Sequence, residues 1–166
     1  MAIDKTITDR TVDRDILVYT VGDDVVLDRD LVVWDCMGTA AHVTMLSKMK
    51  LPSPIVTEEE AATVRKELGK IASLGEKNLF DIKTDDQDVH MAVERVLTEK
   101  LGDLGKKIHT GRSRNDQVAV DVRLHIKDSI LRCETELLSL ASRLLSFGAK
   151  CRKIPLVGRT HLQPAM

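Results

Sequence analysis

The chain has 166 residues and carries 25 Lys and Arg against 26 Asp and Glu, which gives a net charge of −1. This balance argues against a general nucleic-acid binder, which normally needs a basic excess or a dense basic face. No apolar run approaches the ~20 residues that cross a bilayer. The N-terminus also lacks the apolar segment of a signal peptide, so we expect a cytoplasmic protein without a membrane partner.

Composition and cysteine usage narrow the class further. Aromatic residues make up 2% of the chain, which is low for a β-sandwich or barrel and favours helices. The three cysteines lack paired spacing and fit reduced thiols better than disulfides or a zinc site. Because the five histidines also lack metal-ligand spacing, we expect no metal site.

The first part of the chain predicts one helix after an irregular start. Residues 1–24 are polar and predict irregular structure that ends in a turn at 21–24. Asp28 is predicted to cap a helix whose apolar residues run from Leu31 to Leu46. The prolines in the segment 50–54 end this helix, because neither suits a helix interior.

Two further helices are predicted before residue 106. Thr57 and Glu60 have the spacing of a capping box, which predicts a helix that runs to about Ser73. Another helix is predicted to start near 85–88 and to be closed by Gly102 and Gly105. Its inward-facing residues are predicted to be Val89, Val93, Val96 and Leu97.

The segment from Ser113 to about Phe147 is predicted to form one long helix. Its apolar residues recur at steps of four and three, and a second row runs beside them at steps of seven. The resulting face is wider than a two-stranded seam and is typical of a helix inside a multi-helix bundle. Its members are Leu124, Ile126, Ile130, Leu131, Cys133, Leu137, Leu138, Leu140, Leu144, Leu145 and Phe147.

The side chains of this apolar face must pack against other helices to be buried. Burying each large apolar side chain is worth about 1.5–3 kcal/mol, and the preceding helices are too short to cover the whole face. We therefore expect partner helices from other chains or from polypeptide outside this sequence. The sequence stops at Met166, just after a new motif begins, which favours a truncated or split protein.

The motif His109-Thr110-Gly111-Arg112-Ser113-Arg114-Asn115-Asp116-Gln117 stands at the start of the long helix. Ser113 and Asp116 have capping-box spacing, which would leave first-turn N–H groups free to bind an anion. Arg112 or Arg114 could hold a carboxylate through two parallel hydrogen bonds, with Asn115 as a further donor. A charged helix start that faces solvent fits the same residues, and this alternative stays open.

The second motif is Gly158-Arg159-Thr160-His161-Leu162-Gln163-Pro164. His161, in a loop or a first helical turn, could act as an acid or a base near neutral pH. A lone histidine is more often a surface or hydrogen-bonded residue, which is the alternative interpretation.

Taken together and in this order, the two motifs resemble those of the argininosuccinate lyases, a family of the fumarase/aspartase superfamily. Residues 109–124 (HTGRSRNDQVAVDVRL) look like the first signature region of that family, and residues 158–166 (GRTHLQPAM) look like the second. Upstream of both, Asp88, His90 and Glu94 belong to a stretch that is similar to a further part of the family sequence, distinct from its signatures. The likeness covers less than half of the usual family chain.

The resemblance implies a fold, a reaction and an assembly. The fold would be all-α and fumarase/aspartase-like, with a small N-terminal helical domain at 1–112 and the start of a central helical bundle at 113–166. The reaction would be the reversible elimination of argininosuccinate to arginine and fumarate, a step of arginine biosynthesis that requires no metal or organic cofactor. The assembly would be a homotetramer whose active sites combine motifs from three subunits.

The resemblance also implies roles for individual residues. The fumarate half of the substrate would be held by Ser113, Arg114 and Asn115, with Thr160 and Gln163 contributing from the second motif. His161 would be the acid/base histidine or would tune it. The site near the arginine half would be shaped by Asp88 and His90.

Two departures from the family pattern qualify these expectations. The third family signature, a flexible loop with a catalytic serine, has no counterpart in this sequence, so we expect the chain alone to be inactive. Relatives often have a substrate-binding serine near the position of Asp24. Two alternatives remain: another lyase of the superfamily, of the adenylosuccinate lyase, fumarase or aspartase type, or a non-catalytic helical assembly remnant.

Overall fold

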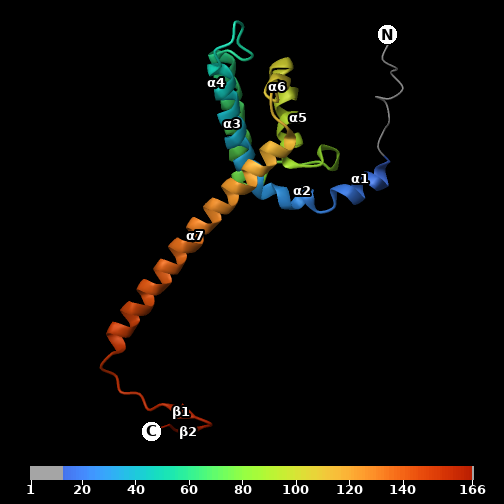
Figure 1. The fold of residues 1–166 in the computed structure, drawn as a ribbon. Helices are drawn as coiled ribbons and strands as arrows, with labels where there is room; N and C mark the ends of the chain where they lie inside the picture. The colour runs from blue at the N-terminus through green and yellow to red at the C-terminus, as the bar shows by residue number, and fades with distance from the viewer. Residues whose placement is uncertain (1–12, 166) are drawn as a thin grey trace. The chain divides into compact units, whose positions relative to one another are not determined.

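A computed structural model describes residues 13–165 of the chain, and Figure 1 shows that nearly all of its regular structure is helical. The all-α prediction is therefore confirmed. Two compact units are present, of which the first ends at His125 and the second begins at Ile126. The predicted boundary between 112 and 113 stays a prediction. Within residues 13–165, every helix falls short of the length or the hydrophobicity that a membrane span requires.

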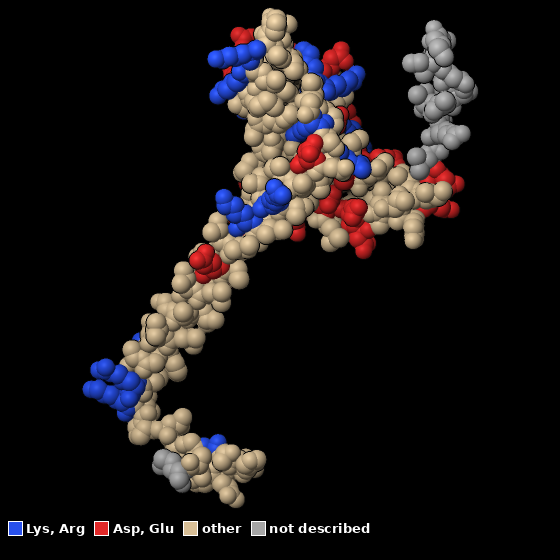
Figure 2. Space-filling view, viewed as in Figure 1, with Lys and Arg blue, Asp and Glu red and all other residues tan. Residues whose placement is uncertain are grey.

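The first unit begins with short helices. They are α1 (Arg14–Val21), α2 (Asp24–Leu27) and a 3₁₀ turn, η2 (Asp28–Leu31). The prediction of irregular structure is wrong for α1, which the Asp13 side chain caps by accepting hydrogen bonds from the N–H groups of Asp15 and Ile16. The predicted turn is confirmed at Gly22 and Asp23, and the part of the prediction for residues 1–12 lies outside the described residues. Acidic side chains gather over α1 and α2 in Figure 2.

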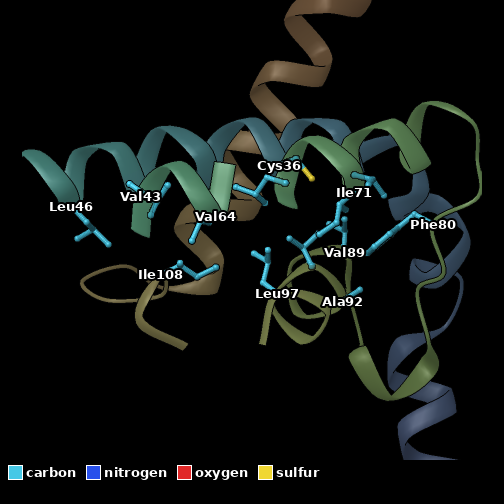
Figure 3. Close-up of a cluster of buried hydrophobic side chains, with 14 of the residues drawn as sticks. Cys36, Val43, Leu46, Val64, Ile71, Phe80, Val89, Ala92, Leu97 and Ile108 are labelled. Carbon is cyan, nitrogen blue, oxygen red and sulfur yellow. The ribbon is translucent and has the colours of Figure 1, made fainter. Parts of the chain in front are cut away.

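Helices α3 (Val32–Lys48) and α4 (Glu58–Glu76) lie side by side and form the centre of the unit (Figure 1). The predicted capping box is confirmed: Thr57 Oγ1 accepts from Glu60 N at 3.1 Å, and a Glu60 carboxylate oxygen accepts from Thr57 N at 2.8 Å. The apolar side chains of α4 belong to the same buried cluster as those of α3 and α5, as Figure 3 shows for part of the core. The buried residues of this core include Val43 and Leu46 on α3 and Val64, Leu68 and Ile71 on α4.

The core is completed by α5 (Val89–Leu101) and α6 (Asp103–Lys107), which follow the 3₁₀ turn η3 (Thr84–Asp86). The predicted inward residues Val89, Val93 and Leu97 are buried, and Val96 packs partly buried against the same cluster. Gly102 ends α5 with a φ of 59°, whereas Gly105 lies inside α6 rather than closing α5.

Asp28 does not cap the helix that follows it. Its Oδ2 atom instead accepts a hydrogen bond from the backbone N–H of Val89 at 3.0 Å, and so it satisfies a donor at the start of α5. Asp88 satisfies a second donor of the same helix by accepting from Met91 N at 2.8 Å. Burial raises the pKa of Asp28, although the hydrogen bond from Val89 opposes the shift.

Helix α7 (Arg114–Cys151) is the long helix that the sequence predicts. In the second unit, the apolar side chains from Ile126 to Phe147 are exposed, and Figure 2 shows mainly uncharged atoms along the visible face of this part. The expectation that partner helices cover them stays a prediction. The unit ends in a hairpin of β1 (Arg159–Thr160) and β2 (Gln163–Pro164), in which Thr160 pairs with Gln163.

Candidate active site

The start of α7 is held by a reciprocal pair of hydrogen bonds. Ser113 Oγ accepts from the N–H of Asn115 at 3.2 Å, and an Asp116 carboxylate oxygen accepts from the N–H of Ser113 at 2.9 Å. Two of the first-turn donors are therefore already used within the turn. Within residues 13–165, the N–H groups of Arg114 and Asp116 have no acceptor, which leaves them for an anion at the positive end of the helix dipole.

Arg114 joins this helix start to the start of α5. Its Nε atom lies 3.2 Å from Asp88 Oδ2, and its Nη1 atom donates to the side-chain oxygen of Gln87 at 3.4 Å. The Asp88 side chain is mostly buried, whereas 44% of the Arg114 side chain is exposed. The structure thus brings together two of the predicted site residues, Arg114 and Asp88, which are 26 positions apart in the sequence.

A small polar cavity opens beside this ion pair. It encloses about 240 Å³ and is lined by Thr20, Val21, Asp24, Gln87, Asp88 and Arg114. Two carboxylates against one guanidinium make its wall acidic on balance, so it suits a cationic group. Asp24 is one of these carboxylates.

The Arg112 guanidinium is partly buried and bonds to residues of the first unit, which leaves Arg114 as the more exposed of the two arginines in the motif. Its Nη2 atom donates to Thr39 Oγ1 at 3.1 Å, and its Nη1 atom donates to the side-chain oxygen of Gln117. Burial lowers the pKa of the guanidinium, against the opposing effect of Asp35 and Asp121. Asn115, in contrast, is exposed, as expected for a residue that meets a ligand.

Asp121 is the most perturbed acid near the site. Its side chain is buried, and its Oδ1 atom accepts from Gln117 Nε2 at 2.8 Å. The other carboxylate oxygen, Oδ2, has no hydrogen-bond partner in the described part of the chain. Burial, reinforced by the negative charge of Asp35, raises the pKa of Asp121 to about 8. The group is therefore largely protonated at neutral pH.

His90, predicted to shape the site, is 1% exposed and reaches no cavity of its own. Its Nδ1 atom lies 2.9 Å from Asp35 Oδ2, and its Nε2 atom lies 3.4 Å from His109 Nδ1. The tautomer that satisfies all three groups has His90 donating to Asp35 and accepting from His109. His90 can therefore act on a ligand only through His109, which is partly exposed.

The same two histidines and Glu94 form a group that the spacing argument missed. Their ligand atoms all lie within 4.8 Å of one another, and imidazole and carboxylate are donors that zinc accepts. The sequence does not predict this group, because His109 follows α6, whereas His90 and Glu94 lie one turn apart on α5. The hydrogen bonds of His90 already account for this arrangement without an ion.

The second motif belongs to the second unit. Thr160 and Gln163 form the last pair of the hairpin, and His161 and Leu162 form its turn. These turn residues have φ values of 47° and 64°, which non-glycine residues adopt at a cost. His161 is exposed and lies in a loop, which is one of the two positions that the sequence predicts for it, the other being a first helical turn.

Comparison with known proteins places this chain in a family. The sequence matches the family described as lyase over residues 10–166. The chain belongs to this lyase family. It is 37% identical over 156 residues to an argininosuccinate lyase of Thermotoga neapolitana. The matched residues make up 94% of this chain and 38% of that protein.

Other members of the lyase family show the same degree of likeness. The chain is 39% identical over 155 residues to an argininosuccinate lyase of Parabacteroides distasonis, and 40% identical over 155 residues to one of Bacteroides fragilis. Each alignment covers 93% of this chain and 34% of the relative. The chain thus spans little more than a third of the length of these relatives.

Proposed function

We propose that this chain is the N-terminal part of an argininosuccinate lyase and works together with polypeptide that covers the rest of the relatives' length. We call this chain, combined with such a polypeptide, the assembled lyase. The proposal is supported by the three relatives that carry this name and by the residues at the start of α7. Residues 1–112 would form its N-terminal domain, and residues 113–166 would begin its central helical bundle.

The observation that carries the proposal is the pairing of two opposite environments at Arg114. On one side are the N–H groups of Arg114 and Asp116, which have no acceptor within residues 13–165, and the exposed side chain of Asn115; these groups suit a carboxylate. On the other side is the acidic cavity with Asp24 and Asp88, which suits a cation. Argininosuccinate has both kinds of group, since it joins a succinate to a guanidinium.

The reaction needs this kind of charge arrangement. A base removes a proton from the carbon next to a carboxylate, and the electron pair moves onto that carboxylate to give an aci-carboxylate intermediate. The pair then forms the new C=C bond while the C–N bond breaks and an acid protonates the departing guanidino nitrogen. The intermediate carries additional negative charge on that carboxylate, which preorganised donors stabilise. We assign this role to Ser113, Arg114 and Asn115, with help from Thr160 and Gln163.

We assign His161 as the acid/base histidine or the residue that tunes it, because an imidazole exchanges protons near neutral pH. Asp88 acts from the cavity wall, and His90 acts through His109. A homotetramer would cover the exposed apolar face of α7 between Ile126 and Phe147 and would combine motifs from different subunits.

The test is a comparison of substrates. The assembled lyase, given argininosuccinate, adenylosuccinate, malate and aspartate separately, should release fumarate only from the first. Turnover of any of the other three in preference to argininosuccinate would assign the chain to another branch of the family. The chain alone should be inactive, and adding the remaining polypeptide should restore the reaction. Appreciable turnover by the chain alone would contradict this dependence.

A further inference from the structure

The side chain of Arg112 is partly buried, whereas its neighbours in the motif are exposed. Its neighbours Gly111, Ser113 and Arg114 are exposed, yet its guanidinium is directed at α3. There it donates to Thr39, whose side chain is fully buried. Both Nη atoms are thereby engaged, and the buried Nε atom has no hydrogen-bond partner among residues 13–165.

The network continues from Arg112 through Gln117. The Gln117 side-chain oxygen accepts from Arg112, and the amide Nε2 donates to the backbone oxygen of Asp35 at 3.1 Å and to Asp121 Oδ1 at 2.8 Å. Thr39 Oγ1 also lies 3.4 Å from Asp35 Oδ1. The buried polar groups of α3 are therefore bonded to residues on both sides of the segment 113–116.

This segment contains the residues to which the proposed function assigns the succinate carboxylate. Gly111, with a φ of 78°, lets the chain turn immediately before it. Arg112 then fixes the segment at its first end, and Gln117 fixes it one helical turn later. Because the two anchors are bonded to each other and to α3, the segment between them has little freedom to rotate.

We propose that Arg112 is a positioning residue, which holds residues 113–115 in their ligand-binding orientation by bonding to Thr39 and Gln117. The inference rests on the proposed function for the identity of the ligand. It differs from a direct role in binding, because Arg112 would touch no substrate. It also differs from a purely structural role, because its loss would loosen one segment rather than the whole unit.

The experiment uses Thr39, which contacts Arg112 but lies away from the exposed segment. Thr39→Val removes the hydroxyl that accepts from Arg112, Thr39→Ser restores it, and Val43→Ala, in the core on the same helix, is the control for general destabilisation. Backbone ¹⁵N order parameters at 113–115 are measured on this chain. We expect rigid values near ~0.85 in the wild type and in Thr39→Ser, and values below ~0.6 in Thr39→Val.

The Val43→Ala variant should keep the wild-type order parameters at 113–115. Equal rigidity in Thr39→Val and the wild type, or equal loosening in Val43→Ala, would overturn the proposal. Arg112→Lys, which keeps the charge but lacks the planar fork, provides the second variant if Thr39→Val does not fold, and it should loosen the same segment.

A measurement of fumarate binding distinguishes a failure of this inference from a failure of the proposed function. In the assembled lyase, Thr39→Val should weaken the binding of fumarate at least about fivefold, and Thr39→Ser should recover it. If the wild type bound no fumarate, the proposed function would fail while the order parameters still decided whether Arg112 positions the segment.

Discussion

The amide nitrogen of Gln117 occupies the space in which a side chain at Gly38 would begin: a Cβ added to Gly38 would lie 2.5 Å from Gln117 Nε2. In the sequence, Gly38 is only a weak point in the middle of a helix. In the structure, it is the position at which α3 lets the start of α7 approach closely. The two helices are joined there by the hydrogen bond from Gln117 to Asp35.

Gly38→Ala tests this close approach. Alanine favours a helix over glycine by about 1 kcal/mol, but here it must displace a buried amide whose lost hydrogen bonds cost about 1–3 kcal/mol. We therefore expect a net loss of unfolding free energy of about 1 kcal/mol or more, measured by urea denaturation.

Gly69→Ala is the matched control on α4, because a Cβ there meets nothing within 4 Å. This variant should gain about 0.5–1 kcal/mol from helix propensity. Similar gains in both variants would show that the contact with Gln117 imposes no constraint on position 38.

Asp121 predicts a specific pH dependence of stability. Its pKa of about 8 in the folded chain lies above that of an ordinary aspartate, so the folded state holds the proton more tightly than the unfolded state. Its contribution to stability is therefore present below about pH 4 and is lost as the pH rises toward about 8. Asp121→Asn has no such proton to lose, and its Oδ1 atom can still accept from Gln117.

Between about pH 5 and pH 8, the wild type should lose more unfolding free energy than Asp121→Asn, by at least about 1.4 kcal/mol, the equivalent of one pKa unit. Urea denaturation at both pH values measures the difference. The exposed substitution Asp30→Asn should follow the wild type. Parallel curves for the wild type and Asp121→Asn would show that Asp121 is ionised throughout this range.

Asp28 predicts a contribution to the stability of α5 rather than of α3. Asp28→Ala removes the acceptor of the Val89 N–H and should cost about 1 kcal/mol, as for other lost helix caps. Asp28→Asn retains an oxygen acceptor and should cost less. Thermal unfolding compares both with Asp30→Ala, an exposed change that we expect to stay within about 0.5 kcal/mol of the wild type. An equal effect of Asp28→Ala and Asp30→Ala on thermal unfolding would show that Asp28 does not stabilise α5.

The features that could be predicted from the sequence are those set by neighbouring residues. The capping box of Thr57 and Glu60 is local, and so is the spacing of apolar side chains on α4 and α7. The helix at 14–21 could not be predicted because it is short and its apolar residues follow one another from Ile16 to Tyr19 instead of recurring at helical spacing.

The features that could not be predicted depend on contacts between distant residues. Arg112 and Thr39 are 73 positions apart, and His90 and Asp35 are 55 apart. Nothing in the motif distinguishes Arg112, which is directed inward, from Arg114, which lines the cavity. The glycine at 38 was the available signal for a close contact, but its partner became evident only in the fold.

His161 predicts an effect on turnover rather than on binding. In the assembled lyase, His161→Asn should lower kcat by roughly 10²–10⁴-fold, the usual contribution of an acid/base group, with little change in KM. Steady-state assays with argininosuccinate measure both constants. His125→Asn, a histidine of α7 outside the two motifs, is the control and should leave both unchanged. A kcat of wild-type size in His161→Asn would assign proton transfer elsewhere.

The most direct test concerns the binding of a four-carbon dicarboxylate at 113–115, and it is a calorimetric titration of the assembled lyase with fumarate. The wild type should release or absorb heat on binding, Asn115→Ala should bind at least about tenfold more weakly, and Asn115→Asp, which adds a negative charge to the same shape, should bind more weakly still. A wild type that binds argininosuccinate but gives no heat with fumarate, or variants that bind fumarate as the wild type does, would contradict the account.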